Sequence, residues 1–133
     1  MHNEVVIVDD DKIVVFLHTT LLKKLDFAQN PRIFENGDDA VKFFRSSKAN
    51  ADNYLILLDI AMPVMDGWEF LDALKDNPVY QKCKIVMITS SIDMADKNKV
   101  DQFANIIDYV EKPLTADKIH QLKQIPEIKQ LIS

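Results

Sequence analysis

The sequence predicts an α/β fold in which a parallel sheet is covered by helices on both faces. Uninterrupted apolar runs recur along the chain, and segments with helical spacing of apolar residues separate them. A strand that is buried on both faces is apolar throughout, so such runs are typical of parallel sheets. Strands and helices alternate in about five βα units, and a helix is the usual connection between two parallel strands.

Five strands are expected, each of them short. In chain order they are residues 5–8, 32–34, 54–58, 85–88 and 106–110. Apolar residues three or four positions apart predict helices between these strands. The residues with this spacing are Val14, Leu17, Leu21 and Leu25 in the first helix, Ala40, Val41 and Phe44 in the second, and Phe70, Leu71 and Leu74 in the third.

The later helices have weaker or interrupted patterns. Asn77-Pro78 is expected to end the third helix, and a polar fourth helix is expected near residues 94–104. Thr115 can cap a final helix that carries Ile119 and Leu122. Because a proline inside a helix removes a backbone hydrogen bond, Pro126 predicts a broken last helix followed by a short extra turn.

The length of 133 residues predicts one domain, residues 1–133, with a core of about 4–124 and a tail of 125–133. Lys and Arg number 16 and Asp and Glu number 21, which gives a formal charge of 16 − 21 = −5. This charge argues against direct nucleic-acid binding, which needs a basic surface. No apolar run is long enough to span a membrane and no signal peptide is evident, so a cytoplasmic protein is expected.

The scarcity of cysteine and glycine excludes several kinds of site. Cys83 is the single cysteine, so an internal disulfide or a cysteine-cluster zinc site is excluded, and we expect an inert thiol. Gly37 and Gly67 are the two glycines of the chain. A P-loop or a glycine-rich dinucleotide fingerprint needs more glycines than these.

Polar side chains follow four of the expected strands. Asp9 and Asp10 come after the first strand, Asp59 after the third, Thr89 after the fourth and Lys112 after the fifth. In open α/β sheets, ligands bind outside the carboxyl ends of the strands, so these residues are expected to lie together. Three neighbouring carboxylates repel one another, and Mg²⁺ is the hard cation that such oxygen ligands favour.

This set of groups fits phosphoryl transfer. An aspartate carboxylate can attack phosphorus and form an acyl phosphate. A cation, a lysine ammonium and a hydroxyl can then stabilise the charge on the phosphoryl oxygens. The pattern of residues does not by itself decide which aspartate is attacked.

Five segments resemble the receiver domain of two-component response regulators. They are Val-Asp-Asp-Asp at 8–11, Asn-Gly-Asp-Asp-Ala at 36–40, Leu-Leu-Asp-Ile-Ala-Met-Pro-Val-Met-Asp-Gly at 57–67, Ile-Thr-Ser at 88–90 and Tyr-Val-Glu-Lys-Pro at 109–113. Their order and spacing match the family from about residue 4 to about residue 124. The resemblance implies a flavodoxin-like (βα)5 three-layer sandwich with strand order 2-1-3-4-5.

The resemblance also implies roles for individual residues. Asp59 would accept the phosphoryl group, and Thr89 and Lys112 would contact its oxygens. Asp10, Asp59 and the backbone carbonyl of Ala61 would bind Mg²⁺, with Asp9 acting through water. Thr89 and Tyr109 would form the conformational switch, and the Lys112-Pro113 bond would be cis.

The function implied by the resemblance is that of a single-domain response regulator. It would take its phosphoryl group from a sensor histidine kinase or a phosphotransfer protein, and would then signal to a downstream protein that the sequence does not name. It would catalyse only its own phosphorylation and dephosphorylation. A homodimer through the fourth and fifth helices stays open.

Three alternatives use the same fold. A receiver-like scaffold would act without phosphorylation, although degenerate receivers usually lose the lysine or an acidic residue. An aspartate-nucleophile phosphatase typically has Asp-x-Asp after its first strand, whereas Asp9 and Asp10 are adjacent. A flavin-binding protein is the weakest alternative.

The remaining polar and aromatic residues have structural interpretations. Asp11 and Asp66 are expected to cap the first and third helices, because aspartate is a favoured N-cap. Trp68 is expected to be a partly exposed packing residue. His18 and His120 are expected to lie on the surface.

Overall fold

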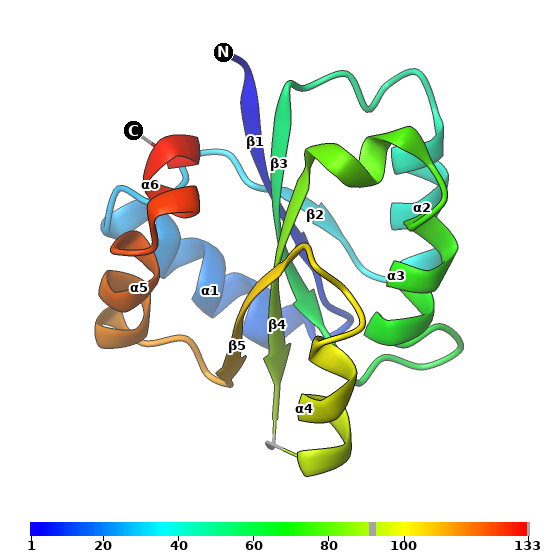
Figure 1. Ribbon diagram of the computed structural model, residues 1–133. Coiled ribbons are helices and arrows are strands. Elements are labelled where there is room, and N and C mark those ends of the chain that lie inside the picture. Colours follow the sequence, from blue (N-terminus) through cyan, green and yellow to red (C-terminus); the bar gives the residue numbers. More distant parts are fainter. Residues whose placement is uncertain (91–92, 133) are drawn as a thin grey trace.

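The computed structural model describes residues 1–90 and 93–132, and in this part of the chain five parallel strands form one sheet (Figure 1). The strand order is β2-β1-β3-β4-β5, so the predicted fold class and strand order are confirmed. The strands are β1 (Asn3–Val8), β2 (Arg32–Phe34), β3 (Asn53–Asp59), β4 (Cys83–Thr89) and β5 (Ile106–Glu111).

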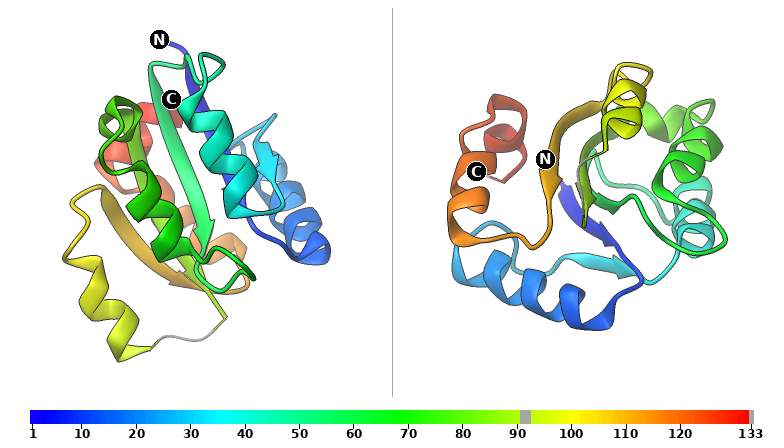
Figure 2. Two further views of the ribbon diagram at one scale, coloured as in Figure 1. Left: turned by 90° about the vertical axis from the view of Figure 1, so that its right-hand side faces the viewer. Right: turned by 90° about the horizontal axis from the view of Figure 1, so that it is seen from below.

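Helices cover both faces of the sheet, as Figure 2 shows from two further directions. On one face lie α1 (Lys12–Lys24), α5 (Ala116–Lys123) and α6 (Pro126–Ile132). On the other lie α2 (Gly37–Arg45), α3 (Gly67–Leu74) and α4 (Met94–Val100), and a 3-10 helix, η1 (Pro78–Lys82), precedes β4. The expected fourth helix is therefore shorter than 94–104, and the third helix ends before Asn77-Pro78.

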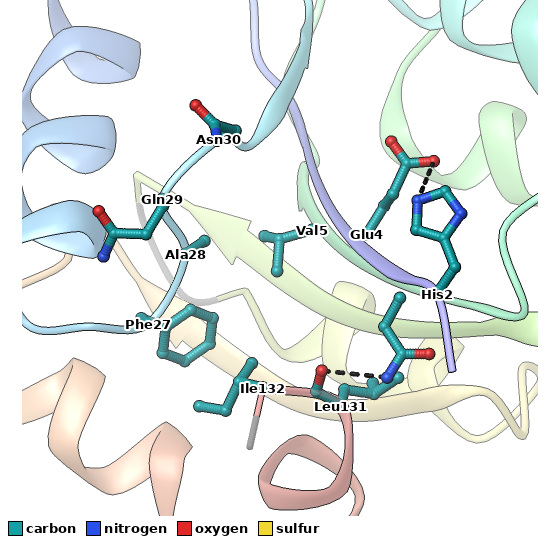
Figure 3. Close-up of a pocket in the computed structure, with 10 residues that line it drawn as sticks. His2, Glu4, Val5, Phe27, Ala28, Gln29, Asn30, Leu131 and Ile132 are labelled. Atoms are coloured by element: carbon teal, nitrogen blue, oxygen red, sulfur yellow. Dashed lines mark hydrogen bonds and ion pairs between the residues drawn. The ribbon is translucent and has the colours of Figure 1, made fainter.

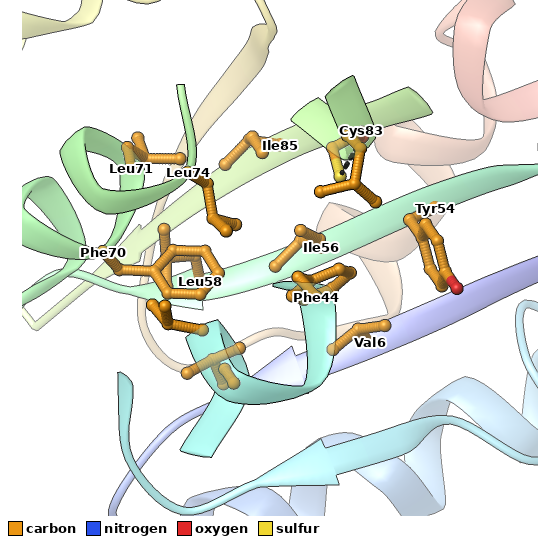
Figure 4. Close-up of a cluster of buried hydrophobic side chains, with 14 of the residues drawn as sticks. Val6, Phe44, Tyr54, Ile56, Leu58, Phe70, Leu71, Leu74, Cys83 and Ile85 are labelled. Carbon is orange, nitrogen blue, oxygen red and sulfur yellow. Dashed lines mark hydrogen bonds between the residues drawn. The ribbon is translucent and has the colours of Figure 1, made fainter. Parts of the chain in front are cut away.

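Aliphatic and aromatic side chains together fill the core between the sheet and α2 and α3 (Figure 4). Phe44 stands nearly perpendicular to Tyr54, with ring centroids 5.1 Å apart, and also contacts Phe70 at 6.1 Å. Cys83 is buried at the edge of this cluster, and burial raises the pKa of its thiol to about 12. The thiol is thus protonated at neutral pH, in agreement with the prediction of an inert cysteine.

Helix caps and the helix break agree with the sequence. Asp11 accepts hydrogen bonds from the amides of Ile13 and Val14, and Asp66 forms a capping box with Glu69. The helix break at Pro126 is confirmed, because α5 ends at Lys123 and Pro126 is the first residue of α6. Proline is tolerated there, since the first residues of a helix have no intrahelical acceptor for their amides.

The buried face of α1 differs from the prediction. His18 and Leu22 are buried, whereas Leu17 is 49% exposed. The apolar spacing was consistent with two rotations of the helix, and contacts with the sheet and with the segment after β5 select the one that buries His18. The prediction of a surface His18 is therefore wrong.

Trp68 is also more buried than predicted, since it is 6% exposed. Its ring stacks on Phe103 with centroids 6.0 Å apart, and its Nε1 donates a hydrogen bond to Asp96 at 2.9 Å. Both partners come from the region of α4, so the burial depends on a helix distant in sequence. The prediction of a partly exposed tryptophan is wrong for this reason.

Val64 has a strained backbone in the connection between β3 and α3. Its φ is 68°, in the left-handed region, and the residue is 99% exposed. Because a β-branched residue is disfavoured there and asparagine is tolerated, Val64→Asn should raise the free energy of unfolding by about 1 kcal/mol. Urea unfolding would measure this gain. Val64→Thr keeps the branched Cβ and should show no gain in the free energy of unfolding. An equal gain in both variants would contradict the conclusion that the backbone of Val64 is strained.

A cleft of about 410 Å³ lies at the amino end of β1, beside α6 (Figure 3). There Nε2 of His2 lies 3.9 Å from Oε2 of Glu4, and Nδ2 of Asn3 donates to the carbonyl of Leu131 at 3.2 Å.

Of the helices that the structure describes, none is long and apolar enough to cross a membrane.

Candidate functional site

Three aspartates meet at the carboxyl ends of β1 and β3. Asp9 and Asp10 follow β1, and Asp59 is the last residue of β3. One carboxylate oxygen from each residue can be chosen so that all three lie within 4.8 Å of one another. Asp9 and Asp59 are 4% and 3% exposed, whereas Asp10 is exposed. The predicted acidic cluster is therefore assembled by the neighbouring strands.

Backbone amides orient the two buried carboxylates. The amide of Asp11 donates to Oδ1 of Asp9 at 2.9 Å, and the amide of Ala61 donates to Oδ1 of Asp59 at 3.3 Å. In both aspartates Oδ2 is the atom that contacts Lys112. The two Oδ2 atoms are thus directed toward the same cation.

Lys112 brings a positive charge to this cluster. Its Nζ lies 2.8 Å from Oδ2 of Asp9 and 3.3 Å from Oδ2 of Asp59. Burial alone would lower the pKa of Lys112, but the hydrogen bond to Asp9 and the charges of both aspartates outweigh burial and raise it. Lys112 is therefore a cation at neutral pH, in a position to contact any anionic group bound at Asp59.

The charge balance at Asp59 is unfavourable in the protein alone. Burial, followed by the charge of Asp9, raises the pKa of Asp59 from 3.8 to about 6, although Lys112 offsets part of this effect. One ammonium therefore does not fully compensate the clustered carboxylates. Carboxylate oxygens are the ligands that Mg²⁺ and similar hard cations favour, so this cluster could hold such an ion.

Thr89 and Lys112 lie at the same edge of the sheet. Thr89 ends β4, is 5% exposed, and pairs in register with Glu111 of β5. Its carbonyl accepts a hydrogen bond from the Lys112 amide at 2.6 Å. The Lys112-Pro113 bond is cis, so that prediction is confirmed.

Tyr109 lies on β5, opposite Met87 of β4. The residue is half-buried and packs against the core cluster that includes Trp68 and Phe103. Burial raises the pKa of its phenol, and the charge of Asp96 raises it further. The ring therefore contacts the region of α4 rather than the acidic cluster.

The family of the chain follows from comparison with known proteins. The family model described as the response regulator receiver domain matches residues 5–124. The chain belongs to this family. Receiver domains interact with histidine kinases or phosphotransfer proteins and bind Mg²⁺ at an acidic pocket.

Relatives and solved structures support the same assignment. The chain is 35% identical over 118 residues to the two-component response regulator ARR22 of Arabidopsis thaliana. The aligned region covers 89% of this chain and 79% of that protein. A crystal structure of a two-component response regulator from Cytophaga hutchinsonii has a TM-score of 0.81 at 28% identity, over 97% of this chain and 98% of that one. One from Legionella pneumophila has a TM-score of 0.80 at 25% identity, over 96% and 98%.

One polar residue beside this site was missed by sequence reasoning. His18 is buried, and its Nε2 accepts a hydrogen bond from the amide of Leu114 at 3.1 Å. The signal available in the sequence was its spacing, since His18 lies four residues before Leu22 and two turns after Asp11. A surface histidine is the more common case, so this spacing alone did not identify it.

Proposed function

We propose that this receiver domain accepts a phosphoryl group on Asp59 and uses it as a signal. The observation that carries the proposal is the contact of Lys112 with the Oδ2 atoms of both Asp9 and Asp59. A buried carboxylate next to a fixed ammonium can act as a nucleophile whose product, an acyl phosphate, is stabilised by the same ammonium. Membership of the receiver family supports the same chemistry.

In the proposed reaction, a carboxylate oxygen of Asp59 attacks phosphorus and forms the new P–O bond. The bond from phosphorus to the donor breaks, and the donor leaves with that electron pair. The Lys112 ammonium and the Thr89 hydroxyl stabilise the phosphoryl oxygens, where the negative charge is concentrated. Donor and acceptor must be held in line, which is the role of the buried, amide-bound carboxylate of Asp59.

Mg²⁺ is the proposed cofactor, and it would supply further positive charge at the phosphoryl oxygens. Asp10, Asp59 and the Ala61 carbonyl are the proposed direct ligands, with Asp9 contributing through water. Asp10 is exposed and can reorient toward an incoming ion, whereas Asp9 and Asp59 are held by backbone amides.

The proposed signal passes through Thr89 and Tyr109. A phosphoryl group on Asp59 would draw the Thr89 side chain toward it, and the space released would admit a different position of the Tyr109 ring. Tyr109 packs against the cluster that contacts α4, so movement of its ring would alter the surface around that helix. A downstream protein that binds there would detect the change.

Intact-protein mass spectrometry tests the proposal. After incubation with acetyl phosphate and Mg²⁺, the protein should gain one phosphoryl group. Asp59→Asn and a chelator should each abolish the gain, since the first removes the nucleophile and the second removes the cation. An unchanged mass, together with no binding of beryllofluoride, would instead favour the phosphorylation-independent scaffold.

The proposed donor is a histidine kinase or a phosphotransfer protein, and the exposed face of α1 suits contact with it. Ile13 and Phe16 are 73% and 70% exposed. Both lie in the first turns of α1, which starts directly after the acidic residues that follow β1. A protein that delivers a phosphoryl group to Asp59 must approach this edge of the sheet. Large exposed apolar side chains are frequent in such contacts.

Phe16→Ser should therefore slow transfer from a protein donor by roughly tenfold, because a truncated hot-spot side chain typically costs more than 1 kcal/mol. Transfer would be followed with any phosphohistidine protein that labels the wild type. Labelling by acetyl phosphate should stay unchanged, since this small donor needs no docking surface. Ile33→Ser, on β2 at 42% exposure, is the matched control. Equal transfer to wild type and Phe16→Ser would contradict the assignment of this surface.

A further inference from the structure

His18 is unusual among the buried residues. The described residues include four buried polar or charged side chains, which are Asp9, His18, Asp59 and Thr89. The other three belong to the site described above. His18 comes instead from the middle of α1, and a polar group is rarely buried without a specific partner.

The partner of His18 lies 96 residues away in the sequence. The Leu114 amide donates to Nε2 of His18 at 3.1 Å, and both residues are buried. Nε2 can accept this bond only when it carries no proton. Burial lowers the pKa of His18 to about 4, which is consistent with a neutral imidazole whose proton is on Nδ1.

Leu114 lies two residues after Lys112, in the connection from β5 to α5. This connection passes beside α1 (Figures 1 and 2). Three kinds of contact hold it in place: the Lys112 amide donates to Thr89, Lys118 Nζ donates to the carbonyls of Glu111 and Pro113, and His18 accepts from Leu114. Of these contacts, the hydrogen bond from Leu114 to His18 joins the connection to α1, the helix that begins beside the acidic cluster.

We infer that His18 is a positioning residue for Lys112, which it holds through the Leu114 amide at the correct distance from Asp9 and Asp59. The inference rests on the proposed function, because the position of Lys112 matters for accepting the phosphoryl group. Without an acceptor at residue 18, the buried Leu114 amide would have to move to find another partner. The Lys112 ammonium, two residues away, would move with it, and misplacement by about 1 Å can slow a reaction by up to roughly a hundredfold.

The test compares His18→Leu with His18→Gln. Leucine removes the acceptor, whereas the glutamine side-chain oxygen can replace Nε2 as an acceptor. With acetyl phosphate and Mg²⁺, the maximal phosphorylation rate of His18→Leu should fall at least about tenfold, and His18→Gln should recover most of that loss. The Mg²⁺ concentration at half-maximal rate should change little in either variant, because the carboxylates remain.

Leu22→Val separates positioning from a general loss of stability. Leu22 is fully buried on the same face of α1, and its side chain is apolar. The valine variant should lose stability yet keep the wild-type rate. If His18→Leu is phosphorylated as fast as wild type, or if His18→Gln is as slow as His18→Leu, the inference is wrong.

A measurement on the wild-type protein does not depend on any variant folding. Nitrogen-15 NMR of labelled histidine should show an unprotonated Nε2 on His18 at neutral pH, and a protonated Nε2 would overturn the inference. A wild-type protein that gains no phosphoryl group would refute the proposed function and the inference with it. Normal labelling of both wild type and His18→Leu would refute the inference alone.

Discussion

Asp59→Asn should raise the free energy of unfolding of the metal-free protein by about 2 kcal/mol at pH 7.5. A carboxyl group whose pKa rises from 3.8 to about 6 on folding costs the folded state about 3 kcal/mol when both states are ionised. Asparagine removes this cost. The pKa of about 6 already includes the attraction of Lys112, so that contact is not subtracted again; the asparagine amide is itself a buried polar group, which makes the net gain smaller.

The gain should depend on pH in a defined direction. Because the pKa of Asp59 is higher in the folded state, the folded state binds the proton more tightly. The wild type should therefore lose stability as the pH rises from about 4 to about 6, whereas Asp59→Asn should not. Near pH 3.5 the two proteins should be about equally stable, and above about pH 6.5 the full difference should appear.

Urea unfolding at a series of pH values would measure this difference. Asp76→Asn, which changes an exposed carboxylate, should leave the free energy of unfolding within about 0.5 kcal/mol of wild type. Added Mg²⁺ should stabilise the wild type more than Asp59→Asn, because the variant has lost one of the proposed ligands. If the stability of the wild type is independent of pH between 4 and 6.5, the conclusion that folding raises the pKa of Asp59 is wrong.

Gly67→Ala should destabilise the protein by about 2 kcal/mol, because it would force apart two backbone segments. A Cβ at residue 67 would lie 2.8 Å from the carbonyl oxygen of Asp59 and 3.0 Å from Cα of Ile60. Both are backbone atoms, so they cannot rotate away as a side chain would. The Gly67 amide also donates to the Ile60 carbonyl at 2.9 Å, which keeps the start of α3 against the end of β3.

Gly37→Ala is the matched control for this prediction. Its Cβ would lie 3.0 Å from Sδ of Met65, which belongs to a flexible side chain that can move aside. Thermal or urea unfolding should place Gly37→Ala within about 1 kcal/mol of wild type. Gly67→Ala should also bind Mg²⁺ more weakly, since it displaces the backbone of Asp59. Equal stability of the two alanine variants would show that the contact at Gly67 is not restrictive.

The position of the candidate site was predictable because parallel strands end at a common edge. Asp9, Asp59 and Thr89 each follow or end a strand whose apolar pattern is clear, so their proximity followed from the fold class. Lys112 required the fifth strand to be placed as well, and its pattern was also readable. The contacts of its Nζ with Asp9 at 2.8 Å and with Asp59 at 3.3 Å could not be predicted, because they depend on where the connection after β5 is held.

Two errors in the prediction of exposure have the same cause. His18 and Trp68 were assigned too much exposure, and in each case the partner lies far along the chain: Leu114 for His18, and Asp96 and Phe103 for Trp68. Helical periodicity identifies an apolar face, but the exact rotation of the helix about its axis is selected by packing. A mixed face, such as that of α1, leaves two rotations open.

The amino-acid sequence was enough to predict the alternation of strands and helices, the caps at Asp11 and Asp66, the break at Pro126, and the edge at which the aspartates meet. These features depend on neighbours within one or two turns or on the common direction of parallel strands. The rotation of α1 and the raised pKa of Asp59 depend instead on how distant segments pack together. Burial and charge at a residue are sums over segments that are distant in sequence, and they exist only once those segments have packed together.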